Sequence, residues 1–272
     1  MLGGGRAALL QAAHPYVASA VSGHSTVMAD VAGRFRRTFE NVFDMVFGTT
    51  EQALERAQLV RRIHERVQGT IEEDVGRFRR GDTYDALDRD ATLWVAATLW
   101  DTIMLVHELL IEGVTPQERE TFYQESAVFL QLFGLERGDV PSTWAAFELW
   151  FGDMLDSDTI AVGDAAREIC HYIIKPPRRA ARPAYAWLEV FTAAILPPRL
   201  RDEYGLRYGL REKLIHRTST GFMRRTLPLV PDRIRYFPAY LDARRRLDGV
   251  AGRDPVGEFM ERVVLAGLSP TR

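Results

Sequence analysis

The 272-residue sequence contains only one cysteine, Cys170. A single cysteine cannot form an internal disulfide, so the fold does not depend on an oxidising compartment. A nucleophilic role would need a nearby base. His171 follows Cys170, but neighbouring residues on a helix point about 100° apart. We therefore expect Cys170 to be a small buried core residue.

Strand patterns and common catalytic motifs are also missing. No stretch alternates apolar and polar residues for long enough to build a sheet. The sequence has no G-x-G-x-x-G, P-loop, G-x-S-x-G or C-x-x-C pattern. Dinucleotide, nucleoside triphosphate, serine-hydrolase and redox-thiol chemistries therefore lack their usual support. The pattern predicts an all-α protein with one large multi-helix domain over residues 1–272.

Neither a signal peptide nor a transmembrane segment is expected. The longest apolar run, Leu93 to Ile111, carries Asp101, His107 and Glu108. Charges in mid-span are costly in lipid, so a buried core helix fits better. Residues 1–20 have only Arg6 as a basic residue, and their apolar run is interrupted at Gln11, His14 and Pro15. These features favour a cytoplasmic protein.

Hydrophobic periodicity, together with residues that favour helix starts and ends, predicts the helices. We expect Thr49 and Gln52 to form a capping box at the start of the helix over 51–68, and Gly69 to end that helix. Pro116 should lie in the first turn of the helix over 116–133. The expected helices cover residues 6–21, 29–47, 51–68, 90–112, 116–133, 142–156, 163–174, 182–195, 197–204, 208–226, 231–247 and 255–267. The stretch from Lys175 to Arg182 reads as an exposed connection.

Charge is distributed unevenly along the chain. Residues 1–174 carry 15 basic and 27 acidic side chains, a net charge of −12, whereas residues 175–272 carry 20 and 10, a net charge of +10. The basic C-terminal third could meet nucleic acid, an acidic membrane surface or an acidic ligand. It could equally complement the acidic part of the same chain, and we expect no nucleic-acid partner.

One histidine lies on an apolar helix face. At 100° per residue, Ala53, Ala57, Val60, His64 and Val67 fall on one stripe of the helix expected over 51–68. A neutral imidazole in apolar surroundings is a frequent metal ligand. Two alternatives remain open: a core histidine bonded to a backbone carbonyl, and a three-histidine metal site of His14, His24 and His64.

The preceding predicted helix adds an anion-binding feature. Phe35, Phe39, Val42 and Val46 are expected to form its apolar stripe. Arg34 and Thr38 lie one turn apart on a flank, where they could hold a carboxylate or a haem propionate. A local hydrogen bond and a surface ion pair are the alternative.

Three short motifs carry a resemblance to a known family. They are Arg34-Phe35-Arg36-Arg37-Thr38, Phe47-Gly48-Thr49 and Val60-Arg61-Arg62-Ile63-His64-Glu65-Arg66-Val67. This segment resembles the catalytic domain shared by latex clearing proteins (rubber oxygenases) and the fungal oxygenase MpaB. The resemblance implies a globin-related helical core that binds haem b, with oxygen-dependent chemistry on an apolar substrate. His64 matches the proximal iron ligand, and Arg34 and Thr38 match the pair near the haem.

Two positions depart from the rubber oxygenases. Arg37 stands where those enzymes have a lysine, and their distal glutamate has no counterpart beside His14 or His24. The resemblance therefore implies a haem-dependent oxygenase that acts on a small hydrophobic substrate with dioxygen, with His14, His24 or Arg37 supplying distal polarity. The alternatives are a non-catalytic haem or lipid binder and a basic-surface nucleic-acid or membrane binder. A homodimer is left open.

Overall fold

The computed structural model describes residues 2–23, 38, 41–111, 113–174 and 181–250. Helices dominate these residues, and the only strands among them are two of three residues each. The prediction of an all-α protein is thus confirmed. The chain divides into two compact units. The larger contains Met1–Ser25 and His64–Arg224, and the smaller contains Thr26–Ile63 and Arg225–Arg272.

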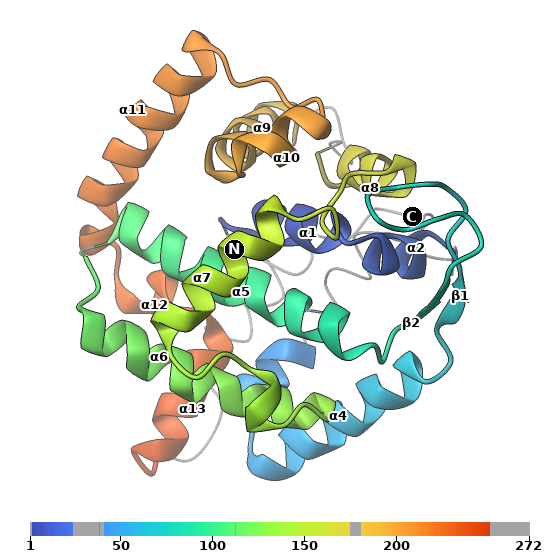
Figure 1. Ribbon diagram of the computed structural model, residues 1–272. Helices are drawn as coiled ribbons and strands as arrows, with labels where there is room; N and C mark the ends of the chain where they lie inside the picture. Colours follow the sequence, from blue (N-terminus) through green and yellow to red (C-terminus); the bar gives the residue numbers. More distant parts are fainter. Residues whose placement is uncertain (1, 24–37, 39–40, 112, 175–180, 251–272) are drawn as a thin grey trace. The chain divides into compact units, whose positions relative to one another are not determined.

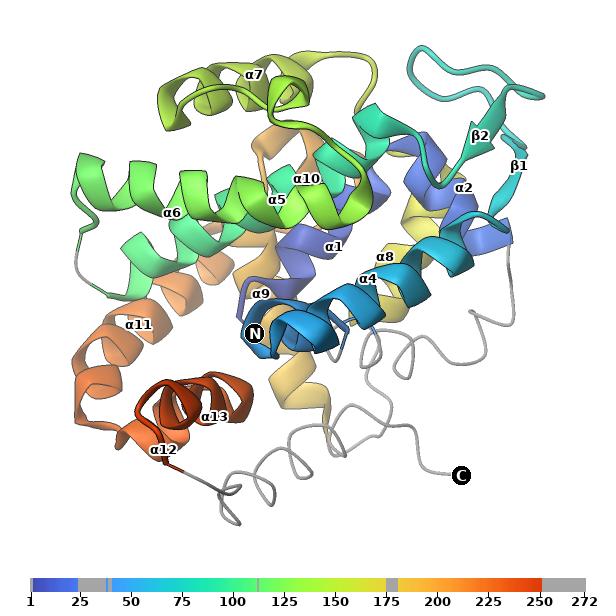
Figure 2. The same cartoon turned by 90° about the horizontal axis from the view of Figure 1, so that it is seen from below.

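The larger unit is organised around its first helix, α1 (Gly4–Ala12). Helix α1 packs against α5, α8 and α9, and α2 packs against α8 and the small sheet (Figure 1). Figure 2 shows α6 running along α5, with α7 packed against α6. The remaining helices of this unit are α2 (Pro15–Gly23), α5 (Arg89–Leu110), α6 (Pro116–Phe129), α7 (Trp144–Asp156), α8 (Asp164–Ile174), α9 (Arg182–Ile195), α10 (Pro198–Glu203) and α11 (Leu210–Thr226), whose last two residues belong to the smaller unit.

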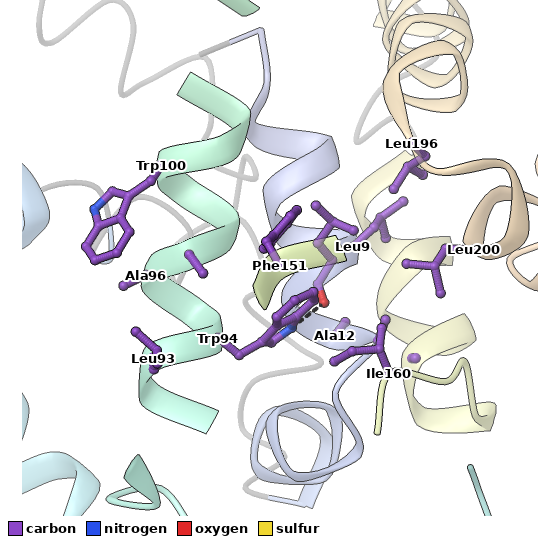
Figure 3. Packing of buried hydrophobic residues seen from close by; sticks show 14 of the residues in the cluster. Leu9, Ala12, Leu93, Trp94, Ala96, Trp100, Phe151, Ile160, Leu196 and Leu200 are labelled. Carbon is purple, nitrogen blue, oxygen red and sulfur yellow. Dashed lines mark hydrogen bonds between the residues drawn. The ribbon is translucent and has the colours of Figure 1, made fainter. Parts of the chain in front are cut away.

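Aromatic side chains fill the core of the larger unit. The Trp94 ring stacks on Phe151 with a centroid distance of 5.2 Å, and its indole N–H donates a 2.9 Å hydrogen bond to the Leu10 carbonyl (Figure 3). Phe147 is fully buried among other rings. These are Trp100, Tyr123, Trp144, Trp150 and Phe151. Cys170 is buried as predicted, and burial raises the pKa of its thiol to about 11.

The long apolar helix α5 is half buried. It is long and apolar enough to cross a membrane, but half of its most apolar 18-residue window is covered by the rest of the protein. Asp88 caps it by accepting a 2.8 Å hydrogen bond from the Ala91 N–H. Ten of its residues are buried, which fits the predicted core helix.

The smaller unit joins two distant parts of the chain. Helix α4 (Thr50–His64) begins with the predicted capping box between Thr49 and Gln52. Residues 41–47 are helical, and Phe43 stacks on Phe237 with ring centroids 4.0 Å apart. Figure 2 shows α4 and α13. The other elements described in the smaller unit are the 3₁₀ helix η4 (Leu227–Leu229) and the α-helices α12 (Asp232–Arg235) and α13 (Pro238–Leu247).

Two expected helices are each divided, and a third ends early. Residues 6–21 form α1 and α2, because Pro15 lacks the N–H that a continuous helix needs. The segment 231–247 is divided before Pro238 in the same way. The helix expected over 51–68 ends at His64, and the chain then pairs in an antiparallel sheet. Its strands are β1 (Gln68–Thr70) and β2 (Thr83–Asp85), so Gly69 lies in a strand and does not end the helix.

The apolar stripe predicted for the helix over 29–47 is also wrong at one position. Val46 is 52% exposed, whereas its neighbour Met45 is 7% exposed. The rings of Phe43 and Phe47 determine the packed face, because they contact Phe237 and Tyr240. The rest of that helix, the helix expected over 255–267 and most of the connection from Lys175 lie outside the described residues.

Candidate functional site

His64 is the last residue of α4, where the chain passes from the smaller unit into the larger one. Its side chain is partly buried, and its carbonyl accepts a 2.9 Å hydrogen bond from the Val67 N–H. Val67 packs against a small apolar cluster formed by Ile71, Val75, Phe78 and Tyr84. The backbone of His64 is therefore held between a helix end and a packed turn.

The burial of α4 supports the predicted orientation of its apolar stripe. Ala57 is 5% exposed, and Ala53, Val60 and His64 are partly buried. The flanking residues Arg61, Arg62, Glu65 and Arg66 are exposed. The imidazole of His64 thus shares the less exposed face of its helix.

His14 lies against the same apolar cluster that Val67 joins. It is 2% exposed, and its ring centroid lies 5.5 Å from that of Tyr16 and 5.7 Å from that of Phe78. The Tyr16 N–H donates to Nδ1 over 3.3 Å, so the proton of a neutral ring resides on Nε2. Burial lowers the pKa of His14 to about 4, although Asp88 acts in the opposite direction. His14 is therefore a neutral imidazole at pH 7.

A pocket of about 540 Å³ opens beside this cluster, within the larger unit. Its lining includes Gln68, four residues after His64, and Tyr16, whose ring packs against His14. Its lining residues are Tyr16, Gln68, Gly69, Thr70, Thr83, Tyr84, Asp85 and Asp88. Sequence patterns missed this pocket, because a helix was expected to continue to residue 68.

The other predicted site residues fall mostly outside the described part of the chain. Arg34, Arg37 and His24 lie there, so their positions stay predictions. Thr38 is exposed. No group of three or more histidine, cysteine or carboxylate side chains able to hold a metal ion occurs among the described residues.

The sequence analysis also missed an ion pair between the buried Arg6 and the partly buried Asp101. Arg6 is 4% exposed, and its Nη2 lies 2.5 Å from Asp101 Oδ2. The same guanidinium donates to Thr102 Oγ1 over 2.6 Å and to the Ile195 carbonyl over 2.7 Å. Each charge stands alone in an otherwise apolar segment. A lone charge in an apolar segment indicates that a buried partner is needed, but it does not identify that partner.

The buried His14 predicts a specific pH dependence of stability. Its pKa is about 4 in the folded protein and near 6.5 in the unfolded chain. Between these values the unfolded chain binds a proton that the folded protein does not. The contribution of neutral His14 to stability is therefore complete above pH 6.5. The free energy of unfolding falls by about 3 kcal/mol in total as the pH falls toward 4. Urea unfolding from pH 4 to 7 measures this slope.

His14→Asn is the matched control for this titration, because an amide oxygen can replace Nδ1 as the acceptor. The difference in unfolding free energy between wild type and variant should change with pH by about 3 kcal/mol over the same range. Parallel curves for the two proteins would show that the titration of His14 does not cause the effect.

The sequence also matches a family model over residues 1–225, described as "ER-bound oxygenase mpaB/B'/Rubber oxygenase, catalytic domain". The match covers most of the chain, so the protein belongs to this family of oxygenase catalytic domains. Comparisons with curated proteins and with solved structures gave no match. The resemblance deduced from the motifs around Arg34, Thr38 and His64 is thus confirmed at the level of the family.

The chemistry of His64 fits an axial haem ligand. A haem iron takes one imidazole nitrogen on its proximal side, so a cluster of several ligands is not required. His64 is partly buried on the apolar face of α4, next to Val60 and one turn beyond it. His14 is a poorer fit, because its ring is 2% exposed and is enclosed by Tyr16 and Phe78.

Proposed function

We propose that this protein is a haem b-dependent oxygenase that acts on a small hydrophobic substrate, with His64 as the proximal iron ligand. Membership of an oxygenase family supports the reaction class. The observation that carries the haem proposal is the position of His64, partly buried on the apolar face at the end of α4. When bound, the haem would supply the iron that activates dioxygen.

The surroundings of His64 suit a fixed ligand. Its backbone is held by the hydrogen bond from Val67 and by the packing of Val67 on the apolar cluster. A ligand with a fixed backbone needs less ordering when it binds iron. In this proposal Arg34 and Thr38 bind the haem propionates, because a guanidinium and a hydroxyl can both donate hydrogen bonds to carboxylates.

In this proposal, polar groups on the side of the haem opposite His64 come from residues near the N-terminus. His14 would contribute as a neutral imidazole whose Nε2 carries the proton, and its ring packs against Tyr16, which lines the pocket. Arg37 would contribute a permanent positive charge, since a guanidinium does not release its proton near pH 7. These two residues, together with Thr38 and Arg34, are the proposed catalytic set.

Haem titration followed by oxygen uptake tests the proposal. The full chain, mixed with haemin and passed through gel filtration, is expected to retain a strong Soret band at one haem per chain. Oxygen consumption is then measured with terpenoid and fatty-acid substrates. Haem retention without any substrate-dependent oxygen uptake would indicate a non-catalytic haem binder. A chain that leaves gel filtration colourless would contradict the haem proposal itself.

A further inference from the structure

Helix α11 exposes apolar and basic side chains on one face. Leu210 is 88% exposed, Leu214 is 63% exposed and Phe222 is 68% exposed. Its exposed arginines within the larger unit are Arg211, Arg217 and Arg224. Figure 1 shows α11 as an outlying helix of the larger unit, reached from α10 through a loop.

These six residues fall on one side of the helix. At 100° per residue, all of them lie within about 80° of Leu214. The only acidic residue of α11, Glu212, lies about 160° away and caps the helix start through a 2.9 Å hydrogen bond from the Gly209 N–H. The opposite side carries Thr220, which is 7% exposed. The exposed face, here called the α11 face, thus combines leucines, a phenylalanine and arginines with no carboxylate.

The charge and apolarity of the α11 face select its partner. A nucleic acid would use the arginines but would gain little from Leu210 and Leu214. A second copy of the same face would bring arginine against arginine, which is unfavourable in a two-fold contact. An anionic lipid surface satisfies both properties, because the arginines meet lipid headgroups while the apolar side chains enter the acyl boundary.

We propose that the α11 face binds the surface of membranes that contain anionic lipids. Leu210, Leu214 and Phe222 insert at the headgroup boundary, and the arginines bind the lipid phosphates. The helix lies in the plane of the membrane surface and does not cross it. This proposal goes beyond the proposed oxygenase function and does not depend on haem.

Vesicle sedimentation tests the proposal with the full chain. The protein is expected to sediment with phosphatidylcholine vesicles that contain one third phosphatidylglycerol, and much less with pure phosphatidylcholine. Each arginine near an anionic surface contributes about fivefold, so Arg217→Gln/Arg224→Gln should weaken binding about 25-fold. Leu210→Ala/Leu214→Ala should weaken it by at least about tenfold, because the variant loses buried apolar area. Added salt should weaken binding of the wild type.

The matched control removes one exposed leucine and one exposed arginine elsewhere in the larger unit. Leu149 is 73% exposed on α7, and Arg80 is exposed in the loop between the strands. Leu149→Ala/Arg80→Gln should bind vesicles like the wild type, and circular dichroism melts confirm that each variant is folded. Absence of binding to the anionic vesicles, or equal binding by all variants, overturns the proposal. A dimer that Leu210→Ala/Leu214→Ala dissociates, without vesicle binding, would assign the face to a second copy.

Discussion

Arg6→Met is expected to lower the free energy of unfolding by about 3 kcal/mol, the low end for a buried pair, because it leaves the partly buried Asp101 carboxylate without its partner. Asp101 Oδ2 accepts no well-aligned hydrogen bond among the described residues and depends on its 2.5 Å ion pair with Arg6. The variant also removes the hydrogen bonds from Arg6 to Thr102 and to the Ile195 carbonyl. Urea unfolding at pH 7 measures the loss.

The pKa directions of the pair show why one partner cannot simply be removed. Burial lowers the pKa of Arg6 and raises the pKa of Asp101, and the mutual attraction opposes both shifts without cancelling either. Burial therefore outweighs the attraction, and the intact pair contributes little net stability compared with apolar residues. Breaking the pair is costly, whereas replacing both partners is not.

The double variant Arg6→Met/Asp101→Leu distinguishes these effects. It should recover most of the stability that Arg6→Met loses, since no charge is left buried. Arg167→Met is the matched surface control, because Arg167 is exposed and pairs with the exposed Asp164. That control should cost at most about 1 kcal/mol. If Arg6→Met unfolds no more easily than Arg167→Met, the ion pair has no special role.

His64→Ala is expected to abolish stable haem binding and all haem-dependent oxygen uptake. Loss of a residue that only orients a metal ligand costs about 10–100-fold in affinity, so loss of the ligand itself should cost at least about 100-fold. The Soret band of wild type and variant after gel filtration gives the result. Unfolding in urea without haem should be nearly unchanged, because the His64 side chain is only partly buried at a helix end.

Two controls separate a ligand from a merely structural histidine. His107→Ala removes an exposed histidine of α5 and should retain haem fully. His64→Gly leaves space for free imidazole, which should restore the Soret band when added in excess. Full haem retention in His64→Ala would assign the iron to another ligand and would contradict the proposed function.

Local sequence signals predicted most helices, but they failed where distant contacts determine the backbone. The capping box between Thr49 and Gln52 and the first-turn position of Pro116 are present as expected, because each depends only on residues a few positions apart. The end of α4 at His64 could not be predicted in this way. Strand β1 exists because Gln68 to Thr70 pair with residues 83–85, and neither segment shows a long alternating pattern.

The candidate site was predicted in part for the same reason. Helical spacing placed His64 on the less exposed face of α4, which the burial of Ala57 and Val60 supports. Helical spacing could not indicate that His14 would meet Phe78 or that Arg6 would meet Asp101, since each pair joins distant segments. Lone polar residues in apolar stretches suggest such contacts without identifying the partner.

The smaller unit is built from two segments far apart in the chain, which affects when it can fold during synthesis. The Phe47 carbonyl accepts a hydrogen bond from Arg246, which is 199 residues later in the chain, and Phe43 stacks on Phe237. A ribosome makes most of the larger unit before these partners exist. The helical segment 41–47 therefore gains these contacts only after α13 has been synthesised, whereas the turn that holds the His64 backbone needs only residues 64–84.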